Sequence, residues 1–167
     1  MIQVNAERRQ MAEIRSMSIS FHTAALAGDE IFQAYPLIQA TCPNVDLASW
    51  KDFAKFFSER ENCGVLALKD PVNCICGVVA YQLDWDLSAG LVLAVHLFTT
   101  VDLINSSRTV LALLEAAETR AAHLGCTCLQ IRLSGSQAKL GSRLSALGLS
   151  SGAGLLWKTV VSRPAVN

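Results

Sequence analysis

Charged residues are scarce in this chain. Only 17% of its 167 residues are charged, and 14 acidic side chains balance 14 basic ones, so the net charge is zero. General nucleic-acid binders are normally basic, because phosphates dominate their contacts, and the balance argues against that class. Weak charge repulsion also permits self-association, for instance as a homodimer.

Long apolar runs are missing as well. The run from Leu91 to Phe98 is too short to span a membrane and contains His96. The N-terminus carries charges where a secretory signal needs apolar residues. Six cysteines without such a signal predict reduced thiols, a cytoplasmic location and no membrane partner.

What the chain has in quantity is apolar surface to bury. Hydrophobic residues make up 51% of the sequence, which disfavours disorder, and the length suffices for one domain with a real core. We predict one domain over residues 17–161. Residues 1–16 would form an extension that is disordered or helical, and residues 162–167 a tail.

One stretch organises the chain, from Gly90 to Gly125. It predicts a strand over 91–99, a polar turn over 102–107 and an amphipathic helix over about 108–123, followed at once by a strand over 126–133. This order is typical of a βαβ unit. Its helix would begin at the carboxyl end of the strand, where backbone N–H groups favour an anion. If the protein binds a phosphorylated cofactor, this turn is therefore the first place to look.

The remaining elements follow from apolar spacing and turn residues. The predicted strands cover 18–23, 63–69, 74–83 and 155–161, and the predicted helices begin near 28–30, 46 and 134–136. We expect Pro36 to kink or break the first helix, and residues 150–154 to form a flexible turn. The predicted order is therefore β, α, α, β, β, β, α, β, α, β.

This order, with the stretches LINSSRTVLALLEAAETRAAHLG and CTCLQIRLSGSQAKLGSRLSALGL, resembles the GNAT N-acetyltransferase superfamily over residues 17–161. The resemblance implies an α/β fold with a mixed, mostly antiparallel sheet of six to seven strands and about four helices. It implies an acyl-CoA-dependent N-acetyltransferase, with acetyl-CoA as co-substrate and a small-molecule or peptide amine as acceptor. A V-shaped split between the central strand and the next would support this family, whereas a closed sheet would indicate an unrelated α/β domain.

The resemblance also implies where acetyl-CoA binds. Its phosphates would lie across the turn formed by Asn105, Ser106, Ser107, Arg108 and Thr109. Its acetyl carbonyl would lie against the strand backbone at Leu97, Phe98 and Thr99, held by hydrogen bonds of the oxyanion-hole kind. The alternative for the turn is simple capping of the helix by a serine.

The sequence departs from the family pattern in two regions. The usual Q/R-x-x-G-x-G/A falls on Asn105, Arg108 and Val110, so both glycines are absent and two side chains are expected to crowd a pyrophosphate. The usual tyrosine acid falls on Leu144, which cannot transfer a proton. A catalytically silent GNAT-fold binding or assembly module is therefore the alternative function.

Candidate residues for the chemistry are few. His96 is the ionisable group inside the apolar central strand, and it is the predicted general base; the alternative is a hydrogen-bonded structural histidine. Asp84 and Trp85 would bind a cationic amine, or simply form a solvated turn. Tyr35 and Trp50 lie in the helical region that lines the acceptor site in this family, and their alternative role is core packing.

The cysteines form two C-x-C pairs, Cys74 with Cys76 and Cys126 with Cys128. Zinc sites usually use C-x₂₋₄-C on turns, where both sulfurs converge. On a strand, residues two apart project from the same face, which suits packing. We therefore predict no metal site.

Overall fold

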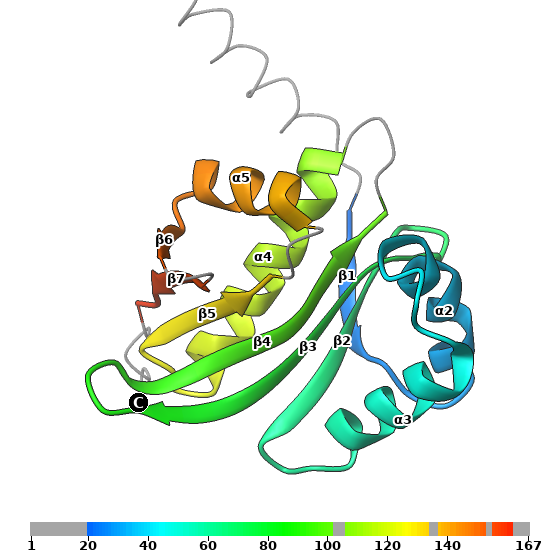
Figure 1. The fold of residues 1–167 in the computed structure, drawn as a ribbon, viewed down its shortest axis with the longest axis horizontal. Helices are drawn as coiled ribbons and strands as arrows, with labels where there is room; N and C mark the ends of the chain where they lie inside the picture. Colours follow the sequence, from blue (N-terminus) through cyan, green and yellow to red (C-terminus); the bar gives the residue numbers. More distant parts are fainter. Residues whose placement is uncertain (1–19, 102–105, 134–136, 153–154, 162–167) are drawn as a thin grey trace, which may run out of the picture.

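The computed structural model describes residues 20–101, 106–133, 137–152 and 155–161. They form a seven-stranded sheet with helices on both faces (Figure 1). The elements, in chain order, are β1 (His22–Ala25), α2 (Glu30–Thr41), α3 (Leu47–Ser58), β2 (Cys63–Lys69), β3 (Ile75–Asp86), β4 (Gly90–Thr100), α4 (Ser106–His123), β5 (Cys128–Arg132), α5 (Ala138–Ala146), β6 (Ser150–Gly152) and β7 (Leu155–Thr159).

The strands lie in the order β1-β2-β3-β4-β5-β7-β6. Only β4 and β5 run parallel within this sheet of described residues, and the α4 crossover between them makes the predicted βαβ unit. All other neighbouring strands are antiparallel. The predicted fold class, a mixed and mostly antiparallel α/β sheet, is confirmed.

The structure corrects several details of the predicted elements. The first strand was predicted over 18–23, whereas β1 covers His22–Ala25 and residues 20–21 are not part of a strand. Helix α2 runs through Pro36 without ending, because the burial of Ala34, Leu37 and Ile38 on the opposite side outweighs one lost backbone hydrogen bond. Residues 150–152 pair with β7 as strand β6, whereas a turn was predicted. Residues 106–107 were predicted as part of the turn, whereas helix α4 begins at Ser106 and includes them.

Two apolar clusters hold the layers together. One lies between the sheet and helices α2 and α3, and it includes Trp50, Phe57 and Val78. The other lies between the opposite face and helices α4 and α5, and it includes Phe98, Leu113 and Leu129. Burial on both faces explains why β2, β3 and β4 are apolar along most of their length rather than alternating.

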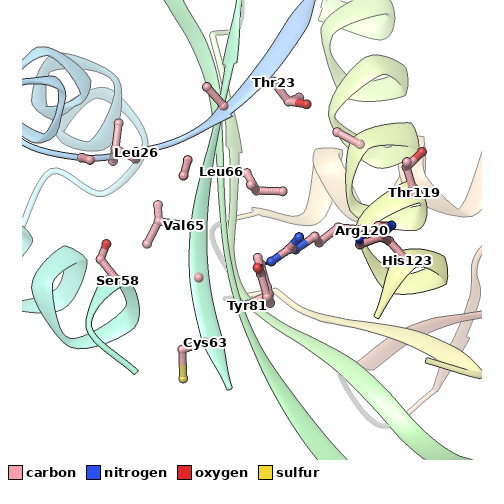
Figure 2. A pocket seen from close by; sticks show the side chains of 15 residues that line it. Thr23, Leu26, Ser58, Cys63, Val65, Leu66, Tyr81, Thr119, Arg120 and His123 are labelled. Atoms are coloured by element: carbon pink, nitrogen blue, oxygen red, sulfur yellow. Dashed lines mark hydrogen bonds between the residues drawn. The ribbon is translucent and has the colours of Figure 1, made fainter. Parts of the chain in front are cut away.

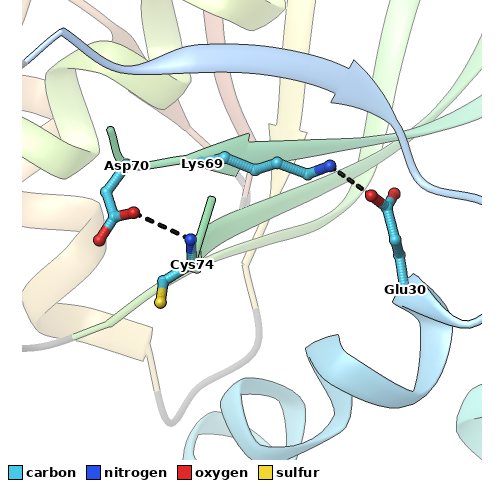
Figure 3. Close-up of polar contacts among 4 residues, drawn as sticks. All are labelled: Glu30, Lys69, Asp70 and Cys74. Carbon is cyan, nitrogen blue, oxygen red and sulfur yellow. Dashed lines mark hydrogen bonds and ion pairs between the residues drawn. The ribbon is translucent and has the colours of Figure 1, made fainter. Parts of the chain in front are cut away.

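Polar contacts fix the ends of several elements. Asp46 caps α3 as predicted, its side chain accepting from the Ser49 N–H at 2.7 Å. The Lys69 ammonium donates to the Glu30 carboxylate and so ties β2 to the first turn of α2 (Figure 3). In the β2–β3 hairpin the Asp70 carboxylate accepts from the Cys74 N–H at 2.9 Å.

The cysteines are all free thiols. Cys126, between α4 and β5, and Cys128, at the start of β5, are both buried, and burial raises the pKa of both thiols. Burial also raises the pKa of Cys76 to about 11, so this thiol stays protonated and unreactive at neutral pH. No helix in the described part of the chain is long and apolar enough to cross a membrane.

We predict that Leu113→Ala destabilises the fold by about 2–5 kcal/mol, because it opens a cavity in the centre of the α4 cluster. Leu113 is fully buried, and its methyl groups lie against Gly77 of β3. Urea unfolding monitored by circular dichroism measures the effect. Leu87→Ala is the matched control, since this leucine is fully exposed; an equal loss in both variants would contradict the packing described.

Candidate active site

The parallel pairing of β4 with β5 is short. It joins Val92–Val95 to Cys128–Ile131, and β4 then continues to Thr100 paired only with β3 among the described strands. Figure 1 shows the two strands diverging toward the end at which α5 lies. We call this end of the β4–β5 pairing the split; it has the form that would support the family resemblance, and it leaves one edge of β4 open.

His96 lies where the split begins, on a β-bulge. Ala80 of β3 pairs with Leu97, and the next residue, Tyr81, pairs with Val95, so His96 is an extra residue in β4. The bulge allows His96 and Leu97 to face the same layer, that of α2 and α3. The imidazole lies 5.4 Å from the Phe57 ring, centroid to centroid, and the residue remains exposed.

The surroundings of His96 favour its neutral form. Partial removal from water lowers the pKa of the imidazole, the positive charge of Arg132 lowers it further, and Asp84 opposes both effects. A histidine whose pKa lies below 6.5 is mostly unprotonated at neutral pH. The side chain predicted as general base is therefore able to accept a proton where the strands diverge.

The open edge of β4 is partly covered by α5. The side-chain amide of Gln137, just before α5, donates to the backbone carbonyl of Phe98 at 3.2 Å. This carbonyl therefore points away from β3, and the N–H of Phe98 shares its direction, because both groups of a residue in an antiparallel ladder face the same side. An amide donor thus stands where a further strand would place its own N–H.

A cavity of about 540 Å³ lies beside this edge. It is lined by Ala40, Thr41, Thr99, Thr100, Gln137, Ala138, Lys139, Leu140 and Arg143. The Thr99 hydroxyl donates to the Thr41 hydroxyl at 2.8 Å, which fixes the end of α2 against the end of β4. The cavity has the size of a small-molecule site and carries basic side chains on one wall.

The predicted cofactor turn lies at this same end of the molecule. Helix α4 begins at Ser106, Ser107 is exposed, and Arg108 and Thr109 are half-buried in its first turn. The first N–H groups of a helix have no partner within it and form an anion site. Asn105 lies outside the described residues.

Two positions that depart from the family pattern are core positions here. Val110 was expected to crowd a pyrophosphate at the turn. Its side chain is instead fully buried in the apolar cluster under α4. Leu144 is also fully buried and packs in the same cluster. Leu144 is therefore a packing residue in this fold.

The predicted substrate-binding residues are dispersed. Trp50 is enclosed between α2 and α3, with 1% exposure, and its indole N–H donates to the Ile31 carbonyl at 2.7 Å. Tyr35 is half-buried, and its hydroxyl donates to the Val45 carbonyl. Asp84 and Trp85 lie exposed near the end of β3, where the Asp84 carboxylate accepts from the Trp85 N–H. A substrate role for these residues stays a prediction; Trp50 has the environment of a core residue.

Sequence reasoning missed the contribution of α2 and α5 to the site. The hydrogen bond between Gln137 and Phe98 joins residues 39 positions apart in the sequence. The one between Thr99 and Thr41 joins residues 58 positions apart. The only local signal was that Gln137 directly follows the polar stretch expected to cap α5. Nothing in that stretch pointed toward β4.

Several solved structures share this fold. An aminoglycoside N-acetyltransferase, AAC(6')-Iy, in complex with CoA superimposes with a TM-score of 0.70 at 9% identity, covering 90% of this chain and 99% of that one. The ribosomal-protein-S18-alanine N-acetyltransferase of Escherichia coli gives 0.65 at 14% identity, with 89% and 99% covered.

A third likeness is to a GCN5-related glucosamine N-acetyltransferase region of a fungal multi-domain beta-N-acetylglucosaminidase. Its TM-score is 0.67 at 11% identity, and the match covers 83% of this chain but 18% of that one. No family model matches the sequence, and no curated protein matches it either. The chain thus has the GNAT acetyltransferase fold, at sequence identities that establish the fold alone.

We predict that the pKa of His96 lies below 6.5 in the folded protein, that Arg132→Gln raises it and that Asp84→Asn lowers it further. Histidine ring signals followed by NMR across pH give these values. Because the pKa is lower in the folded than in the unfolded chain, His96 makes folding stability fall as the pH drops below about 6.5. In His96→Gln this contribution would vanish; an unchanged pH dependence would contradict the assignment.

Proposed function

We propose that this protein is an N-acetyltransferase that uses acetyl-CoA to acetylate an amine. The observation that carries the proposal is the open edge of β4 at Phe98, whose carbonyl accepts from a side-chain amide in place of a strand. A pantetheine arm carries amide groups and extends like a strand. It can pair with such an edge by the main-chain hydrogen bonds of strand addition.

The other parts of the cofactor have matching positions on this chain. The N-terminus of α4, with Ser107, Arg108 and Thr109, would bind the pyrophosphate at the end of the split. The thioester carbonyl would lie against the strand at Leu97–Thr99, where the Phe98 N–H faces the split. Lys139 and Arg143 of α5, which line the neighbouring cavity, add favourable charge nearby. Gln137 would give up its bond to Phe98 when the arm binds.

The chemistry would be direct transfer. The amine nitrogen attacks the thioester carbonyl carbon, a C–N bond forms, the C–S bond breaks and the thiolate leaves. His96, kept neutral where the strands diverge, takes the proton that the amine loses, directly or through a water. Because Leu144 cannot donate a proton, a water molecule protonates the leaving thiolate.

A second candidate is a GNAT-fold binding module without catalysis, and a homodimer would be one form of it. The observation that favours it is the core position of Leu144, which removes the acid that the family usually supplies. This candidate keeps the fold and loses turnover. Measuring binding and turnover separately distinguishes the two.

We expect saturable binding of acetyl-CoA in calorimetry, with coenzyme A and ATP as comparison ligands. Arg108→Ala would weaken binding by about tenfold, the loss typical of one charged phosphate contact. Arg60→Ala is the matched control, since Arg60 is exposed at the end of α3 on the opposite layer. No heat of binding up to millimolar acetyl-CoA would contradict the proposal and direct the search to partner proteins.

Turnover would be assayed with an aminoglycoside, glucosamine and a peptide that begins with alanine, which represent the acceptors of the structural relatives. His96→Ala would lower kcat/KM by about 10²–10⁴ while leaving acetyl-CoA affinity within about twofold. Binding without turnover for any amine would instead support the silent module.

A further inference from the structure

The edge of the sheet has a second cavity, where β1 leaves β2. Their pairing ends with Ala25 opposite Leu66, followed by a bond from the Leu26 N–H to the Val65 carbonyl at 2.9 Å. Beyond this point the first residues of β2 pair only with β3 among the described strands. A cavity of about 610 Å³ opens here, within the size range of small-molecule sites (Figure 2).

Arg120 of α4 is positioned over this cavity by Tyr81 of β3. The Arg120 Nε–H donates to the Tyr81 hydroxyl at 2.8 Å, and the guanidinium carbon lies 5.7 Å from the ring centroid. Figure 2 shows the two side chains pointing toward each other beside His123. Tyr81 is 3% exposed, so the arginine is held by a rigid partner.

Gly64 of β2 makes room for this arrangement. A Cβ at Gly64 would lie 2.4 Å from the Tyr81 hydroxyl oxygen, so another residue there would displace the ring. Glycine inside a strand normally weakens it and marks a close approach. Here the group that approaches Gly64 is the Tyr81 ring, which positions Arg120. Strands β2 and β3 and helix α4 therefore together determine where the guanidinium lies.

The charge of Arg120 has no counter-charge in the described part of the chain. The ion pairs among those residues do not include it, and no carboxylate lines the cavity. Tyr81 uses one of five guanidinium donors, which leaves the forked end for an oxyanion. Thr119 and His123 lie on the same side of α4, and Leu66 and Ala25 supply an apolar wall.

We propose that this cavity is a binding site for a small organic monocarboxylate, with its carboxylate on Arg120 and its apolar body against Leu66. One guanidinium matches one negative charge, and its fork matches the two carboxylate oxygens. The site is separate from the proposed acetyl-CoA site. Arg120 is about 20 Å along α4 from the N-terminus of the helix, and the two cavities share no lining residue.

The test is titration of the full chain with benzoate, followed by NMR amide shifts. We expect saturable shifts at Gly64, Thr119 and Arg120, with a Kd of about 1 mM for this fragment-sized probe. Arg120→Gln would weaken binding by about tenfold or more. The matched control, Arg60→Gln, would leave it unchanged, since Arg60 does not line the cavity.

A second variant protects the test against misfolding of Arg120→Gln. Thr119 is exposed on α4, so Thr119→Trp fills the cavity from the surface without altering the core, and it would also abolish the shifts. Absence of saturation up to about 20 mM benzoate, or shifts confined to the split between β4 and β5, would overturn the site. Equal binding of inorganic phosphate would overturn its assignment to a carboxylate.

Discussion

The ladder between β4 and β5 ends at Val95, and the candidate active site depends on this end. A strand buried in a sheet normally satisfies both of its edges, so a central strand that loses one neighbour must find other partners for its backbone. The side-chain amide of Gln137 is one such partner, and it bonds to Phe98 from outside the sheet. The central strand therefore presents polar backbone groups to a cavity, while its side chains remain in the core.

The bulge at His96 lies directly beyond the last residue paired with β5, Val95. The extra residue shifts the alternation of side chains beyond His96, so that Leu97 faces the layer of α2 and α3 beside the imidazole, and Phe98 faces the cluster under α4. Partial removal from water and the positive charge of Arg132 lower the pKa of the His96 imidazole at this position. Bulges of this kind often redirect a side chain beside an active site.

Both faces of the sheet are fully committed to packing, and this limits where function can arise. Val110 and Leu144 occupy positions at which related folds carry functional residues, yet both are core side chains here. Two of the cavities lined by described residues lie at strand edges: one beside the open edge of β4, and one beside β2, where Tyr81 holds Arg120. Both candidate sites therefore lie where strand pairing ends, at the margin of the packed layers.

The sequence alone determined the elements whose cause is local. Apolar spacing and the Asp46 cap defined α3, and the strand, polar turn and amphipathic helix after Gly90 defined the βαβ unit. The element order was enough to predict the fold class. Tertiary structure alone decided where the pairing of β4 ends, which residue is bulged, and that Gln137 meets Phe98. These features depend on contacts between residues far apart in the chain, whose geometry is set by the packing of whole layers and leaves no periodic trace in the sequence.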